Sequence, residues 1–270
     1  MRPVTTVELT KYQALGNDYL VLDLPADLEA VRDRLPALCD RQRGLGSDGL
    51  LAFDLAAMSV RILNPDGSEA EKSGNGLRIV AAHAVLAHGA GERFSLRTPD
   101  RSNAVRIVGL SGPEVVSEVD IGRPVFDPDG WITLSTSAGT ARCRLVDLGN
   151  PHCVVFDQAV TEARCRELGP ALERHSRFPD RTNVQLAEVR DRRYLRAVIW
   201  ERGAGYTLAS GTSASAVAAA AMRIGAADDD VRVEMPGGAL AVRRLASGEM
   251  VQTGPARRVY RASVDLADLV

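Results

Sequence analysis

The two halves of the sequence repeat each other, and this repeat restricts the possible folds more than any other feature. Leu-Gly-Asn precedes an apolar run ending in Asp at Asn17 and again at Asn150, 133 residues later. Ser-Gly opens an apolar segment at Ser73 and again at Ser210, 137 residues later. A third match, between GSDGLL and TNVQLAEV, has an offset of 135. Three matches in one order at nearly constant spacing indicate an internal duplication.

Each half combines short strand-like runs with one apolar helix that follows a turn of small residues. The run 214–222 is apolar on nearly every side, so the helix it forms must be enclosed. We therefore expect an α/β (α+β) fold with two pseudo-symmetric domains, 1–130 and 131–270. Each would wrap a strand-rich sheet around a central helix, and the C-terminal tail would pack back on the first domain. The interface between the halves is the expected place for a site.

Charge and cysteine usage exclude several classes of protein. Thirty-three basic and 35 acidic side chains give a net charge of −2, so nothing favours binding to nucleic acid or an anionic membrane. The four cysteines form no C-x-x-C pair, and the N-terminal residues lack the apolar core of a secretory signal. We expect a reduced, cytoplasmic setting.

The sequence also argues against the common cofactors and against a metal. The only lysines, Lys11 and Lys72, do not lie in a P-loop motif, and their scarcity disfavours a pyridoxal-phosphate enzyme. The string GLGSDG at 44–49 precedes a strand-like run, whereas a dinucleotide fingerprint precedes a helix. His83 and His88 are five residues apart, which should place them on different sides of a helix. We therefore expect no metal site and no cofactor.

The turns that open the two helices are the first candidates for chemistry. A helix N-terminus presents backbone N–H groups and partial positive charge to a carboxylate or phosphate, and small residues allow close approach. Ser73 and Ser210 could hold one substrate between them, or each could simply cap its helix. Polar residues lie close by in the sequence: Asn64, Asp66, Glu69 and Glu71 in the first half, and His152, Glu201 and Arg202 in the second. A solvated loop and a structural histidine are the alternative interpretations.

The long motifs resemble those of diaminopimelate epimerases along nearly the whole chain. They read KYQALGNDYLVLD, GLGSDGLL, RILNPDGSEAEKSGNGLR, LGNPHCVVF, TNV and ERGAGYTLASGTSAS. The resemblance implies a cofactor-independent isomerase of lysine biosynthesis that inverts an amino-acid α-carbon. One residue removes the α-proton and its counterpart returns a proton to the opposite face. The implied partner is a small amino acid shaped like diaminopimelate, and a homodimer is compatible with the resemblance.

The same resemblance assigns site residues at matching positions. It places Ser73 and Ser210 at the positions of the acid/base pair, Glu201 among the substrate contacts and His152 next to the reaction centre. Because an unassisted hydroxyl is a poor base, we expect Glu201 or His152 to act as or to activate the base, so all four are candidate catalytic residues. The resemblance also implies substrate contacts at Asn17, Asn64, Asn150, Asn183 and Arg202, and backbone anion binding at Gly74, Asn75, Gly211 and Thr212.

The sequence departs from the family pattern at the reacting groups. Ser73 and Ser210 stand where the family has its two acid/base cysteines, and an alkyl hydroxyl is far less acidic than a thiol. Tyr206 and Ser215 replace a glutamate and a further cysteine that are common in the family. Three alternatives to a working epimerase follow: a non-catalytic amino-acid-binding homologue, a variant trapped by Cys-to-Ser replacement, and a lyase that abstracts an α-proton from one side.

Overall fold

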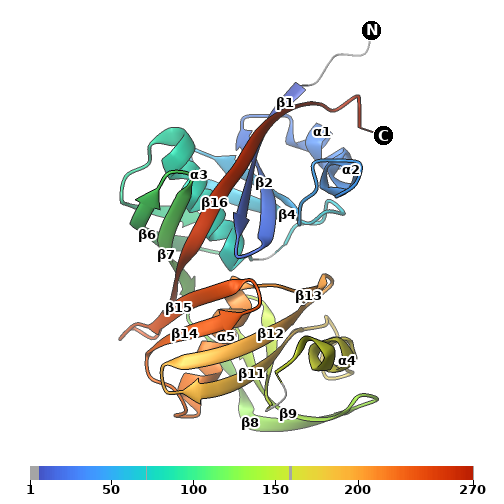
Figure 1. The fold of residues 1–270 in the computed structure, drawn as a ribbon, viewed down its shortest axis with the longest axis vertical. Helices are drawn as coiled ribbons and strands as arrows, with labels where there is room; N and C mark the ends of the chain where they lie inside the picture. Colours follow the sequence, from blue (N-terminus) through green and yellow to red (C-terminus); the bar gives the residue numbers. More distant parts are fainter. Residues whose placement is uncertain (1–5, 71, 158–159, 270) are drawn as a thin grey trace. The chain divides into compact units, whose positions relative to one another are not determined.

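The computed structural model describes residues 6–70, 72–157 and 160–269. The chain forms two compact units (Figure 1). Unit 1 contains the residues up to 119 together with those from 255 onward, and unit 2 contains residues 120–254. The units change over at Val119–Asp120 and Gly254–Pro255. The domain bounds 1–130 and 131–270, with the C-terminal tail on the first domain, stay a prediction. Glu71 lies outside the described residues.

Unit 1 is a sheet with one long helix and two short ones. Its strands follow the order β1-β2-β3-β4-β5-β6-β7, and β1 also pairs with β16. The strands are β1 (Thr6–Ala14), β2 (Asn17–Leu24), β3 (Leu50–Asp54), β4 (Ser59–Leu63), β5 (Arg93–Arg97), β6 (Ser102–Ser111), β7 (Glu114–Gly122) and the second part of β16 (Met250–Asp265). The helices are α1 (Leu28–Asp33), α2 (Leu35–Cys39) and α3 (Gly74–His88).

Helix α3 is the central helix of unit 1. Ser73 caps its N-terminus by accepting a hydrogen bond from the Gly76 amide at 2.9 Å. Gly89, in the left-handed conformation, ends it. Every residue from Gly74 to Ala84 is buried, as expected for a helix enclosed by strands.

Unit 2 repeats this plan with one sheet and two helices. The strand order is β16-β15-β14-β12-β11-β10-β9-β8, with β13 beside β12. The strands are β8 (Val125–Thr136), β9 (Gly139–Asp147), β10 (Pro151–Phe156), β11 (Asn183–Asp191), β12 (Tyr194–Glu201), β13 (Gly205–Thr207), β14 (Asp230–Met235), β15 (Gly238–Arg244) and the first part of β16. The helices are α4 (Glu162–Glu173) and α5 (Gly211–Arg223).

Helix α5 is the counterpart of α3. Ser210 caps it, and all residues from Gly211 to Met222 are buried. The apolar run at 214–222 is therefore an enclosed helix, as predicted. The prediction of a strand-rich α+β fold with a central helix in each half is confirmed. Among the described residues, no helix combines the length and apolar character needed to cross a bilayer.

The C-terminal strand contributes to both sheets. Its first residues pair with β15, from Met250 opposite Arg244 to Thr253 opposite Ala241. Its later residues run antiparallel to β1, from Arg257 opposite Gln13 to Asp265 opposite Thr6 (Figure 1). The C-terminal residues thereby complete the sheet of unit 1.

A prediction concerns Gly49, which precedes β3. Its backbone has φ +151°, and a Cβ atom there would lie 2.3 Å from the backbone oxygen of Leu63. Replacement by alanine should therefore lower the free energy of unfolding by roughly 2 kcal/mol or more, through strain and steric overlap. Gly91→Ala is the matched control, because a Cβ at Gly91 meets no atom within 4 Å. Urea unfolding of both variants measures the difference, and equal stabilities would contradict the strain.

Candidate active site

The first half-site is built around the N-terminus of α3. The Ser73 hydroxyl accepts from Gly76, and the Ser73 carbonyl accepts from the Leu77 amide at 3.0 Å. The residues after Ser73 are glycine, asparagine and glycine, and a Cβ at Gly76 would lie 3.1 Å from the side chains of Leu51 and Ser73. The small residues let α3 begin directly against its neighbours. Ser73 is thus both a cap and the residue that the resemblance marks as reactive.

A chain of hydrogen bonds fixes the polar side chains beside this turn. Asn75, which is buried, donates to the Asn17 side-chain oxygen at 3.0 Å. Asn17 in turn donates to Asp48 at 2.7 Å, and Asp48 also accepts from the Asp18 amide at 3.0 Å. Arg41 bridges the carboxylates of Asp18 and Asp48 at 2.7 and 2.6 Å. The structure therefore brings two predicted residues, Asn17 and Asn75, into contact.

Asp48 is held among groups that act on its charge in opposite directions. Burial raises the pKa of Asp48, and the nearby Asp18 carboxylate adds to that effect. Hydrogen bonds from the Asp18 amide and from Asn17, together with the charge of Arg41, act to lower it. Asp48 lies in the repeated string GSDGLL, and its carboxylate positions Asn17 by accepting the hydrogen bond from the Asn17 side chain.

Arg78 is a residue that the sequence analysis missed. Its side chain is fully buried, and its guanidinium donates to the Asn75 side-chain oxygen at 2.6 Å and to the Gly74 carbonyl at 3.4 Å. Within the part of the chain that the structure describes, no carboxylate pairs with it, and its Nε has no partner. Burial lowers the pKa of Arg78 to about 9, which leaves it charged at pH 7. Its position one turn after Asn75 on the same helix face was the available signal.

Asn64 is placed differently. It opens the turn after β4, where its side chain donates to the Ser68 hydroxyl at 3.0 Å and its amide donates to the Ser68 carbonyl at 2.8 Å. Among the described residues, no hydrogen bond joins it to the chain formed by Asn17 and Asn75. The structure therefore shows Asn64 as part of a turn, and its contact with substrate stays a prediction.

The second half-site lies at the N-terminus of α5. The Ser210 hydroxyl accepts from the Ser213 amide at 3.5 Å and lies 3.5 Å from the Thr212 hydroxyl. Ser210 and Thr212 are both buried. Ser215 turns back to donate to the Gly211 carbonyl at 2.9 Å, so it supports the first turn of the helix. The capping geometry of Ser73 is thus repeated at Ser210 with a longer hydrogen bond.

His152 lies in a buried polar chain beside this helix. Gln185 donates both to the His152 Nδ1 at 3.0 Å and to the Ser213 hydroxyl at 3.0 Å. An amide donor at Nδ1 requires the proton to be on Nε2, which then donates to the Asn150 side-chain oxygen at 2.9 Å. The structure therefore connects His152 to Asn150 and, through Gln185, to α5.

Asn183 connects two further predicted segments. Its side chain donates to the Pro151 carbonyl at 2.9 Å and accepts from the Arg202 amide at 3.0 Å. It also lies opposite His152 in the parallel pair β10–β11. Asn150, His152, Asn183 and Arg202 therefore form one neighbourhood in unit 2, as their assignment to one site requires.

The turn that carries Glu201 and Arg202 depends on a glutamate that the sequence analysis missed. Glu173, at the end of α4, is buried and accepts from the Trp200 indole at 2.8 Å and from the Gly203 amide at 2.9 Å. These two hydrogen bonds fix both sides of the turn to the end of α4. Gln185 was also missed, although its position two residues after Asn183, on the same face of β11, was an available signal.

The residues that depart from the family pattern are packed in the protein. The Tyr206 ring lies under the Arg166 guanidinium at 4.6 Å and packs against the core of unit 2.

All four cysteines are free and buried. None of the four lies in α3 or α5. Burial also raises the pKa of the Cys165 thiol to about 12, which disfavours the reactive thiolate form. The described residues thus place no cysteine at either helix N-terminus.

One prediction from spacing was wrong. His83 and His88 are not separated by α3, because their ring centroids lie 5.1 Å apart and both Nε2 atoms contact Asp23 of β2. His88 is the last residue of the helix, followed by the left-handed Gly89, and at a helix end a long side chain can turn toward a neighbouring strand. The angle between positions on an ideal helix therefore did not predict this contact.

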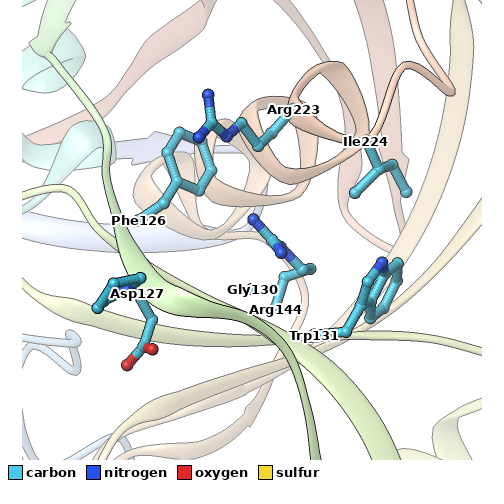
Figure 2. Close-up of a pocket in the computed structure, with 8 residues that line it drawn as sticks. Phe126, Asp127, Gly130, Trp131, Arg144, Arg223 and Ile224 are labelled. Carbon is cyan, nitrogen blue, oxygen red and sulfur yellow. The ribbon is translucent and has the colours of Figure 1, made fainter.

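Unit 2 also contains an open pocket that includes none of the predicted site residues. Its volume is about 540 Å³, and it is lined by Phe126, Asp127, Pro128, Gly130, Trp131, Arg144, Arg223 and Ile224. Figure 2 shows the Arg223 side chain reaching the Phe126 ring, and the two guanidinium groups lie near different rings, Arg223 5.4 Å from the Phe126 centroid and Arg144 5.9 Å from the Trp131 centroid. Asp127 is paired with Arg177 at 2.9 Å. The two arginines make this pocket basic.

Comparisons with known proteins identify the relatives of the chain. The family model for diaminopimelate epimerase matches residues 9–126 and 144–259. A diaminopimelate epimerase 2 from Nostoc sp. is 40% identical, covering 86% of this chain and 87% of the relative. A diaminopimelate epimerase from Carboxydothermus hydrogenoformans is 35% identical, covering 94% and 98%. A solved hydroxyproline epimerase from Agrobacterium vitis has a TM-score of 0.74 at 16% identity, covering 99% and 95%, and shares the fold.

A prediction concerns the buried chain through Gln185. Gln185→Leu removes the amide that donates to both His152 and Ser213. Leaving buried polar groups without a hydrogen-bond partner lowers stability by about 1–3 kcal/mol. The free energy of unfolding should fall by that amount, and long-range ¹H–¹⁵N NMR should show His152 losing its single Nε2-protonated form. Gln42→Leu is the control, because Gln42 is exposed. A wild-type spectrum with the proton on Nδ1 would contradict the assignment.

Proposed function

Because the chain belongs to the diaminopimelate epimerase family, we propose that it is an isomerase that inverts an amino-acid α-carbon of a diaminopimelate-like substrate. The Cα–H bond breaks, its electron pair stays on the α-carbon beside the carboxylate, and a new Cα–H bond forms on the opposite face. This exchange needs no net oxidation or reduction. The observation that carries the proposal is the pair of equivalent half-sites, each a serine-capped buried helix beside an ordered asparagine.

The electrostatics of the first half-site support binding of a carboxylate. A helix N-terminus favours an anion. Arg78 adds a buried positive charge that contacts Asn75 and Gly74 and that no described carboxylate neutralises. A buried unpaired charge is costly, and an anionic ligand nearby offsets that cost. We therefore assign the substrate's reacting carboxylate to the backbone of Gly74 and Asn75, together with that of Gly211 and Thr212 in unit 2.

The second half-site supports recognition of the distal amino-acid end of the substrate. Asn183 holds the Arg202 backbone in place, so the arginine side chain extends from a fixed point. A guanidinium can meet a carboxylate with two parallel hydrogen bonds. We assign Arg202, with Asn150 and Asn183, to the distal carboxylate, and Asn17 and Asn64 to the remaining polar groups of the substrate.

Proton transfer is assigned to Ser73 and Ser210, which stand where the resemblance places cysteines. The four buried cysteines lie elsewhere in the fold and offer no substitute. A hydroxyl is a weak base, so it needs a neighbouring group to accept its proton. We assign that role to Glu201. His152 has its Nε2 proton directed at Asn150 and its Nδ1 occupied by Gln185, which favours a positioning role through Asn150.

The test is exchange of the substrate α-proton with solvent in deuterated water, followed by NMR with diaminopimelate stereoisomers. Wild type should exchange the proton and interconvert the stereoisomers. Ser73→Ala and Ser210→Ala should each slow interconversion at least about a hundredfold, the low end for general acid–base catalysis. Ser176→Ala, at an exposed position in unit 2, is the matched control and should behave as wild type.

The double variant Ser73→Cys, Ser210→Cys separates the alternatives. Activity only in the cysteine form would mean that the serines have trapped or abolished turnover. Exchange without inversion would indicate a lyase-like, one-sided chemistry. Tight amino-acid binding with no exchange in either form would leave a binding protein and would contradict the proposed isomerase. We propose a homodimer as the oligomeric state. A measurement of the molar mass in solution tests it, and the mass of a single chain would contradict it.

A further inference from the structure

A cluster of three potential metal ligands lies in unit 1, at the opposite end of α3 from Ser73. It consists of Asp23 of β2 with His83 and His88 of α3. One ligand atom from each side chain lies within 4.8 Å of the others. The helix has 15 residues, so the cluster is about 20 Å along its axis from Ser73. It is therefore a separate feature from the half-site.

The distances in the cluster suit a small cation. The Asp23 Oδ1 lies 2.9 Å from the His83 Nε2 and 3.0 Å from the His88 Nε2. Ligands at the usual Zn–N and Zn–O distances of about 2.0–2.2 Å lie roughly 3.3 Å apart when the geometry is tetrahedral. A shift of a few tenths of an ångström would therefore admit an ion among the three atoms.

The surroundings orient one histidine as a ligand. The His83 Nδ1 lies 3.1 Å from the Tyr12 hydroxyl, and the hydroxyl oxygen can accept a hydrogen bond from Nδ1–H once Nε2 binds a metal. The Phe53 ring lies 5.9 Å from the His83 ring and 6.0 Å from the His88 ring, so it forms an apolar wall. The His83 side chain is 2% exposed, whereas those of His88 and Asp23 are 23% and 45% exposed. The cluster is thus buried on one side and open to solvent on the other.

We propose that Asp23, His83 and His88 bind one Zn²⁺ ion, with water completing its coordination. Two imidazoles and one carboxylate with an open position form a ligand set that zinc uses in proteins. The ion would join β2 to the C-terminal end of α3. Because β2 starts at Asn17 and α3 starts after Ser73, it would hold together the two elements that carry this half-site. The inference does not depend on the proposed function.

The experiment uses untagged full-length protein freed of metal with EDTA. Calorimetric titration with Zn²⁺ should give one ion per chain, and Co²⁺ should give the visible absorption of a tetrahedral complex. His88→Gln and Asp23→Asn should each weaken binding at least about tenfold. Excess Zn²⁺ should raise the Tm of wild type by a few degrees and leave that of His88→Gln unchanged.

Two controls make the result decisive. His175→Gln removes a histidine of unit 2 outside the cluster and should bind Zn²⁺ as wild type does. Circular dichroism checks that each variant is folded, and His88→Gln and Asp23→Asn are preferred to changes at the buried His83 for that reason. Absence of Zn²⁺ and Co²⁺ binding, or binding that survives both ligand variants, would overturn the proposal and leave a hydrogen-bonded cluster only.

Discussion

The structure depends on satisfying the N-termini of two buried helices. The first backbone N–H groups of a helix have no hydrogen-bond partner within the helix. When the helix is enclosed, water does not reach them, so a side chain has to accept their hydrogen bonds. Ser73 and Ser210 do this for α3 and α5. The same hydroxyls are the proposed reacting groups, and the small residues that follow them allow an anion to approach. The cap that each helix requires thus occupies the position that catalysis would use.

The polar side chains beside the two helix N-termini are buried or half-buried, and they hold one another in place through hydrogen bonds. Asn75 depends on Asn17 and Arg78, and His152 depends on Gln185 and Asn150. A buried polar group is tolerated when it is hydrogen-bonded, and a satisfied network holds its members in one geometry. Such fixed donors are what recognition of a charged amino acid needs, because they lose little freedom on binding.

The sequence predicted the fold better than it predicted the supporting contacts. The repeat and the apolar run at 214–222 were sufficient to predict two halves with central helices, because both can be recognised in the sequence without knowing which residues meet in space. Arg78, Gln185 and Glu173 were missed, since their importance comes from partners distant in the sequence. The His83–His88 contact was excluded by an ideal-helix argument that fails at a helix end, and it depends on Asp23, 60 residues earlier than His83.

In the proposed mechanism, the two serine-capped helices act on one α-carbon from opposite faces. A crystal structure of the protein with bound diaminopimelate tests it most directly. We predict that the Ser73 and Ser210 hydroxyl oxygens lie on opposite sides of the same α-carbon and within about 10 Å of each other, as hydrogen-bond-scale contacts on both faces require. A ligand bound in a closed state with the two oxygens farther apart, or with both on one face, would contradict the two-sided mechanism.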